Sequence, residues 1–195
     1  MNKELAYKKR NKVDISENSK YHQGVYIPKN KEKCLSKINQ YRSSWELKFM
    51  RWCDNNPLVV KWGSEVLSIP YKNPVKNLEY CVKNNLNPSD SKNWGLSNYW
   101  TDFAILMKDS KNNIKKYIIE IKPFAETQAP KNLNESASLK EKKRFNKQAQ
   151  TYLVNIAKWK AAEIYCRQNG MEFLIITERT LDKKAKGKRN CRRHT

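Results

Sequence analysis

The stretch from residue 99 to residue 123 constrains the fold of this chain more than any other part of it. Residues 99–107 and 116–123 are rich in aromatic and aliphatic side chains, and the segment 108–113 between them is polar. Two β-rich runs joined by a short polar segment predict a β-hairpin. The rest of the chain is therefore expected to be organised around this hairpin.

The hairpin also carries charge at defined positions. Because strand side chains alternate between faces, Glu120 and Lys122 lie on one face and Ile119 and Ile121 on the other. Antiparallel pairing could bring Asp102 within reach of the first pair. Two carboxylates and an ammonium group suit a Mg²⁺ or Mn²⁺ site in which the lysine orients or deprotonates an attacking water, as in phosphodiester hydrolysis. A surface hairpin with a cross-strand ion pair worth about 0.2–1 kcal/mol is the alternative.

The charge balance indicates a polyanionic partner. The chain has 40 Lys and Arg against 19 Asp and Glu, a net charge of +21. Such an excess favours nucleic acid, although an anionic membrane or an acidic protein surface would fit as well. No apolar run approaches the roughly 18 residues of a membrane span, and no apolar signal core is present at the start, so a soluble, intracellular protein is expected.

The number and positions of the cysteines and histidines argue against several kinds of site. The five cysteines are scattered without a CxxC pair, which argues against a zinc ribbon or a disulfide framework. His22 and His194 lie near the ends, so a histidine metal site or a Ser/His/Asp triad in the core is not expected. Carboxylates, lysines and tyrosines remain as the catalytic inventory.

Residues 41–54 predict a helix that ends before Pro57. Its aromatic residues recur at i, i+4 and i+7 and predict one buried stripe: Trp45, Phe49 and Trp52. Glu46 lies on the neighbouring stripe, which could draw its carboxylate inward. The pattern from Ser43 to Glu46 is also a capping box, in which the glutamate caps its own helix. The residues leave a metal-site acid and a cap equally open.

The remaining elements are predicted from the hydrophobic pattern and from the Gly, Pro and Asn residues that interrupt it. Strands are expected at 58–62, 66–71 and 171–178, an insertion at 72–98, a loop passing into a basic helix start at 124–147, and a helix at 148–169 that ends at Gly170. Glu65, between the first two strands, is read as a loop charge in preference to a metal-facing acid. Gln148 and Lys158 fall on the polar face of the last helix, where a solvated face is the simpler account of either residue.

Both ends of the chain are strongly basic. Residues 1–23 are interpreted as an arm that either touches nucleic acid or only solubilises the protein. Residues 183–195 contain seven Lys and Arg and no acid, which predicts a disordered tail whose natural partner is nucleic acid. One α/β domain at 24–182 is expected between them, with a mixed sheet flanked by helices.

The order of acids and elements resembles the PD-(D/E)xK nuclease superfamily. The matching residues are a helix acid, a hairpin aspartate, a Glu-x-Lys pair and a following helix. The segments 41–57, 69–71, 119–123 and 157–162 further resemble the head-completion nucleases of large contractile-tailed phages, relatives of the TnsA-type transposon endonucleases. The long segment 72–98 and the basic ends depart from that pattern.

This resemblance implies a restriction-endonuclease-like fold and a Mg²⁺- or Mn²⁺-dependent DNA endonuclease that acts late in head assembly. It places the acids on Glu46, Asp102 and Glu120 and the lysine on Lys122, with the Ile121 carbonyl as a further metal ligand. A lysine beside a dication would have a depressed pKa and could act as a base.

By the same resemblance, Gln148 and Lys158 would face the site. Double-stranded DNA and the phage portal, neck or head proteins would be partners, without a membrane, in the virion and in the host cytoplasm. The alternatives are a structural virion protein that binds DNA without cutting it, and a transposase or restriction subunit.

Overall fold

The computed structural model describes residues 22–181, so the predictions for the arm up to residue 21 and for the tail from residue 182 lie outside the described residues. Four strands form the main sheet: β3 (Val59–Ser64), β6 (Phe103–Lys108), β7 (Ile114–Ile121) and β8 (Glu172–Ile176). Two ribbons lie beside it: β1 (Gly24–Val25) with β2 (Gln40–Tyr41), and β4 (Ser68–Tyr71) with β5 (Ser97–Trp100). The helices are α1 (Ser44–Asn55), α2 (Pro74–Lys83) and α3 (Leu139–Gln168), with short 3-10 turns η1 (Lys31–Lys33), η2 (Ser91–Asn93) and η3 (Phe124–Thr127).

The main sheet is mixed, in the order β3-β6-β7-β8. The predicted hairpin is present as β6 and β7, which pair antiparallel with Phe103 opposite Ile119. β7 and β8 run parallel, with Glu120 opposite Ile175. A parallel neighbour needs a crossover, and α3 supplies it between β7 and β8.

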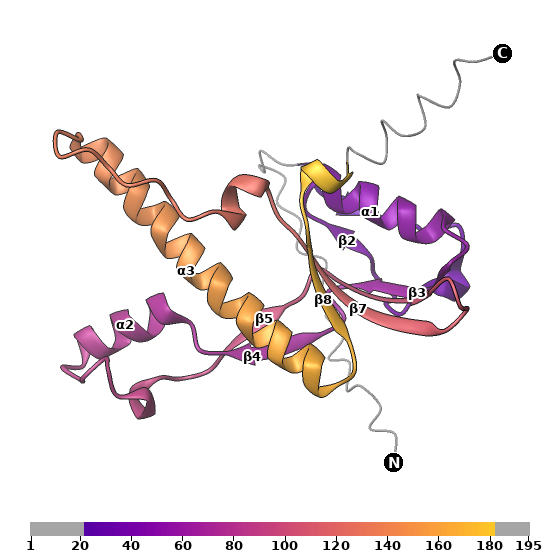
Figure 1. Cartoon of the computed structure of the whole chain (residues 1–195), viewed down its shortest axis with the longest axis horizontal. Helices are drawn as coiled ribbons and strands as arrows, with labels where there is room; N and C mark the ends of the chain where they lie inside the picture. Colours follow the sequence, from indigo (N-terminus) through magenta and orange to yellow (C-terminus); the bar gives the residue numbers. More distant parts are fainter. Residues whose placement is uncertain (1–21, 182–195) are drawn as a thin grey trace.

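Helices cover the two faces of this sheet (Figure 1). Phe49 and Met50 of α1 pack on the face that carries Ile105 and Ile119. Ala162 and Cys166 of α3 belong to a second core with Ala104, Ile118 and the β4–β5 ribbon. Alternate residues of β7 therefore point into different cores, as the alternation predicts.

The first run of the hairpin is not one strand, as the sequence suggested, but two. β5 ends at Trp100 and pairs with β4, whereas β6 begins at Phe103 and pairs with β3 and β7. The backbone N–H of Thr101 donates to the Leu67 carbonyl, and the N–H of Glu65 donates to the Asp102 carbonyl. The break arises because residues 101–102 bond to the β3–β4 connection and so turn the chain from one sheet to the other.

Two helical segments differ from expectation. The segment expected as an insertion contains α2, which Asn73 caps through its side chain and Pro74 begins. The last helix begins nine residues earlier than predicted, at Leu139, because Ser138 and Glu141 form a capping box in a stretch without apolar periodicity. α3 ends at Gln168, and Gly170, with a φ of 63°, follows its C-cap residue as expected.

The buried stripe of α1 was only partly predicted. Phe49 is buried, but Trp45 and Trp52 pack at the margin of the core, and the most buried positions are Met50, Cys53 and Asp54 on the neighbouring stripe. The four cysteines among residues 22–181 are free. No helix in this part of the chain is long and apolar enough to cross a membrane.

Candidate active site

Asp102 lies at the break between β5 and β6, where its carboxylate faces the end of β7. Its Oδ2 accepts a hydrogen bond of 2.7 Å from the backbone N–H of Ile121. The N–H and C=O of one strand residue face the same side, so the Ile121 carbonyl is directed toward the side on which Asp102 lies. A carboxylate and a backbone carbonyl are thus presented together at the end of the sheet.

Glu120 and Lys122 lie on one face, as the alternation predicts. Lys122 Nζ is 3.2 Å from Glu120 Oε1, and the Glu120 side chain is only 2% exposed. The hydroxyl of Tyr99, from β5, donates a hydrogen bond to Glu120 Oε2. Both oxygens of this buried carboxylate are therefore held, one by a cation and one by a phenol. Tyr99 was not singled out from sequence, where only its residue type pointed to it.

The two hairpin acids repel each other. Burial raises the pKa of Asp102 well above its usual value, and the charge of Glu120 raises it further. Burial alone would lower the pKa of Lys122, but the charges of Glu120 and Asp102 outweigh it and raise this pKa. In the protein itself Lys122 is therefore a firmly held cation. The depressed pKa expected beside a dication concerns the metal-bound state and stays a prediction.

Glu46 occupies the first turn of α1 as a cap. Its Oε2 accepts the backbone N–H of Arg42 at 2.8 Å, and its Oε1 accepts the Ser43 hydroxyl at 2.9 Å. Burial raises the pKa of Glu46, which these hydrogen bonds and Lys122 oppose. The charge of Glu46 in turn raises the pKa of Asp102. The residue is thus both a cap and an electrostatic neighbour of the hairpin acids.

Glu65 lies beside this helix start in the β3–β4 connection. Its Oε1 is 3.2 Å from Arg42 Nε, and its φ is 48°. It also raises the pKa of Glu46. The loop position and an ion pair are as expected for a loop charge, while its proximity to Glu46 keeps it at the edge of the site.

Of the two α3 candidates, the structure brings only Lys158 to the site. Its Nζ lies 5.4 Å from the centre of the Tyr99 ring, and its pKa is lowered by burial although Glu120 opposes the shift. Gln148 is exposed and lies ten residues, about 15 Å, farther along the helix. Gln148 therefore lies on a solvated part of α3, whereas Lys158 is partly buried beside Tyr99, and a role for either residue in the reaction stays a prediction.

The donor set fits a divalent cation with few protein ligands. Asp102 and Glu120 supply hard oxygen atoms, the Ile121 carbonyl a third, and the mutual repulsion of the two neighbouring carboxylates is what a cation would relieve. Within residues 22–181, however, no group of three or more His, Cys, Asp or Glu is arranged to hold a metal ion. Glu46 therefore stands outside a direct three-acid cluster.

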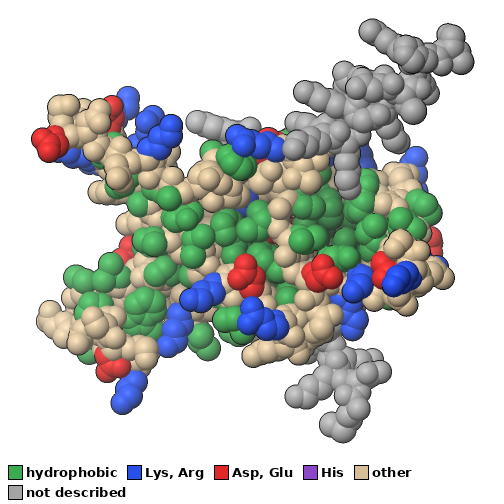
Figure 2. Space-filling view, in the orientation of Figure 1, with side chains coloured by type: hydrophobic (Ala, Val, Ile, Leu, Met, Phe, Trp, Pro, Cys, Tyr) green, Lys and Arg blue, Asp and Glu red, His purple; other side chains and the backbone are tan. Residues whose placement is uncertain are grey.

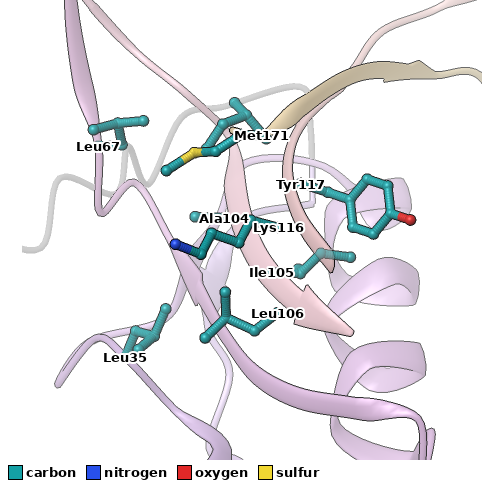
Figure 3. Close-up of a pocket in the computed structure, with 9 residues that line it drawn as sticks. Leu35, Leu67, Ala104, Ile105, Leu106, Lys116, Tyr117 and Met171 are labelled. Atoms are coloured by element: carbon teal, nitrogen blue, oxygen red, sulfur yellow. The ribbon is translucent and has the colours of Figure 1, made fainter. Parts of the chain in front are cut away.

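The pocket drawn in Figure 3 lies elsewhere. It has a volume of about 140 Å³ and opens among Leu35, Leu67, Ala104 and Met171, on the α3 side of the sheet. In the figure Tyr117 points away from this group. No lining residue is acidic. The pocket is a mostly apolar, partly open hollow without acidic side chains, so it offers no alternative to the carboxylate cluster as a metal site.

Comparison with known proteins identifies the family of the chain. The model of the TnsA-like endonuclease N-terminal family matches residues 56–178. The chain is also 36% identical over 162 residues to the head completion nuclease of Enterobacteria phage T4, covering 80% of this chain and 91% of that protein. The mixed sheet flanked by helices confirms the predicted fold class. The chain belongs to the TnsA-like endonuclease family.

Proposed function

We propose that the protein is a metal-dependent DNA endonuclease that acts in phage head completion after DNA packaging. The relation to a head completion nuclease supports the biological role, and membership of an endonuclease family supports the reaction. The single observation that carries the assignment is the convergence of Asp102, Glu120 and Lys122 at the end of β7.

Asp102, Glu120 and the Ile121 carbonyl would hold Mg²⁺ or Mn²⁺. When bound, such an ion stabilises the negative charge that develops on the attacked phosphate. Lys122, fixed by Glu120, positions the nucleophilic water and shields it from the carboxylates. Lys158 is a further cation on the same side, placed to contact a phosphate oxygen of the substrate.

Glu46 acts on the ion through a bridging water or through the electrostatic field of its carboxylate. It caps α1, and within residues 22–181 it forms no group of three acids with Asp102 and Glu120 that is arranged to hold an ion, which favours an indirect contact with the ion over direct ligation. Glu65 would act one step farther out, by holding Arg42 at the start of α1. Double-stranded DNA is the substrate, and the portal, neck or head proteins of the phage are the partners, in the virion and in the host cytoplasm during assembly.

Cleavage of supercoiled plasmid tests this proposal. Wild-type protein should convert it to open or linear forms with Mg²⁺ or Mn²⁺ and not with EDTA. Asp102→Ala and Lys122→Ala should lose cleavage, whereas Lys115→Ala, an exposed lysine of β7 remote from the acids, should retain it. Full activity in the first two variants would reject these roles. Salt-dependent DNA binding without metal-dependent nicking would identify a structural DNA-binding protein of the virion instead.

A further inference from the structure

The N-terminal half of α3 is an arm that projects beyond the sheet (Figure 1). Its first fully buried residue is Asn155, sixteen residues after the helix begins at Leu139. A capping box at Ser138 fixes its start, so the arm is an ordered helix. An exposed helical segment that buries so little adds little to the core, and its surface is available to a partner.

The arm is basic, and its acid is already engaged. Lys140, Lys142, Lys143, Arg144 and Lys147 are all exposed. The accompanying acid, Glu141, accepts hydrogen bonds from the backbone and hydroxyl of Ser138, although it remains close enough to Arg144 for that charge to lower its pKa. Figure 2 shows Lys and Arg side chains gathered at this free end, separated by a notch from the lobe that contains α2.

Part of this charge lies on the face that leads to the active site. Residues 140 and 158 are eighteen positions apart, which is five full turns, so Lys140 and Lys158 share one face of α3. Arg144 and Lys147 fall within about 40° of the same line. Lys158 is the residue that reaches over Tyr99 beside Glu120. The arm stripe, defined as Lys140, Arg144 and Lys147, therefore points along the same side as the cluster of acids.

We propose that the arm stripe binds the phosphate backbone of duplex DNA and holds it in line with the active site. This rests on the proposed nuclease function. Eighteen helical residues span about 27 Å. With about 3.4 Å per base pair, the stripe would reach phosphates up to about 8 base pairs from the phosphate at Lys158. Such contacts position the duplex without reading its sequence.

Charge-matched triple variants test the proposal. The arm variant is Lys140→Gln, Arg144→Gln and Lys147→Gln. The control is Lys111→Gln, Lys115→Gln and Lys116→Gln, which removes the same charge from the exposed β6–β7 hairpin. Binding to a fluorescent 24-base-pair duplex is measured by anisotropy in EDTA from 50 to 200 mM salt. Circular dichroism and melting verify folding, and Lys147→Gln alone serves as a milder variant.

The arm variant should lower the slope of log affinity against log salt by about 2.7, and Lys147→Gln by about 0.9, relative to the control. Over this fourfold salt range the arm variant should therefore lose about 40-fold less affinity than wild type. Equal slopes for arm and control variants would overturn the proposal. A parallel binding assay with phosphatidylserine vesicles gives the other contrary result. If the arm variant loses affinity only for the vesicles and not for the duplex, the arm binds a membrane surface and the proposal is overturned.

Because this binding is measured without a divalent ion, it separates the two proposals. If the arm variant shows the reduced salt dependence but the wild-type protein never cuts plasmid, the DNA-binding role of the arm stands and the nuclease proposal fails. If the wild-type protein cuts plasmid but the arm variant binds DNA as the control variant does, the nuclease proposal stands and the role of the arm fails.

Discussion

The Tyr99 hydroxyl donates a hydrogen bond to Glu120 Oε2, and both side chains are buried at 2% exposure. Because Lys122 holds the other oxygen of Glu120, the carboxylate is fixed at both ends. The phenol comes from β5 and the acid from β7, so the contact ties the β4–β5 ribbon to the end of the main sheet that carries the candidate active site. Tyr99 is a positioning residue for Glu120.

Tyr99→Phe removes that hydrogen bond and leaves a buried carboxylate oxygen without its donor. We expect the free energy of unfolding to fall by about 1.5–3 kcal/mol. Plasmid cleavage should fall about tenfold, with a higher Mg²⁺ concentration needed for half-maximal rate, because Glu120 is no longer held for the ion. Tyr80→Phe, on the exposed side of α2, is the matched control. An unchanged Mg²⁺ dependence would show that Tyr99 supports only stability.

Asp102→Asn separates activity from stability. The amide keeps an acceptor for the Ile121 N–H and removes one of two neighbouring, mutually repelling carboxylates. In EDTA the variant should unfold at higher temperature, by a free energy on the order of 1 kcal/mol. Cleavage should fall at least 100-fold, since a proposed metal ligand is lost.

The control for this variant lies in the hairpin turn. Asp109 is exposed and accepts the backbone N–H groups of Lys111 and Asn113. Asp109→Asn should melt at a lower temperature than wild type and cut at the wild-type rate. A lower melting temperature for Asp102→Asn as well would contradict the repulsion argument.

The sequence revealed the hairpin because its signals are local. Alternation in 116–123 placed Glu120 beside Lys122, and the structure confirms it. The length of α3 was underestimated because its first turns bury almost nothing, so no apolar periodicity could reveal them; only Ser138 and Glu141 carried a signal. α2 was missed although Asn73 and Pro74 are a helix start, because the surrounding Asn and Pro residues suggested a loop.

Contacts between distant segments could not be predicted from sequence alone. Tyr99 bonds to Glu120 only because the chain breaks at residues 101–102, and that break depends on bonds to Leu67 and Glu65. Lys158 appeared equivalent to other polar residues of α3 until the packing of Trp159 and Ala162 fixed which way the helix is turned.

Asp54 makes the stability of the fold dependent on pH. Burial raises the pKa of its carboxyl, but hydrogen bonds from Tyr26, Lys29 and Asn30 outweigh burial and hold the pKa below its ordinary value of 3.8. In return, burial and Asp54 raise the pKa of Tyr26 to about 12. The stabilisation by Asp54 is therefore present above pH 3.8 and is lost as the pH falls through the lower pKa of the folded state.

Asp54→Asn should accordingly lower the free energy of unfolding by about 2 kcal/mol at pH 7. The difference from wild type should shrink below pH 3.8, where the unfolded wild-type carboxyl is already protonated. Urea unfolding at pH 7 and pH 3 measures this. Asp90→Asn, which alters one exposed contact to Lys92, should show a small effect at both values. A difference that grows toward pH 3 would contradict the assignment.

Ser138→Ala tests whether the cap holds the arm of α3. The Ser138 hydroxyl donates to Glu141 Oε2 at 2.7 Å, and Oγ accepts the Glu141 N–H at 3.3 Å. Its loss should cost about 1 kcal/mol of local stability. Hydrogen exchange should speed up about fivefold at amides 142–146 and stay constant at 158–162, where α3 packs on the sheet. Ser136→Ala, an exposed neighbour, should change neither. Equal acceleration along all of α3 would contradict this prediction, because the arm and the packed half would then unfold together. In that case Ser138→Ala would also slow cleavage by disturbing Lys158.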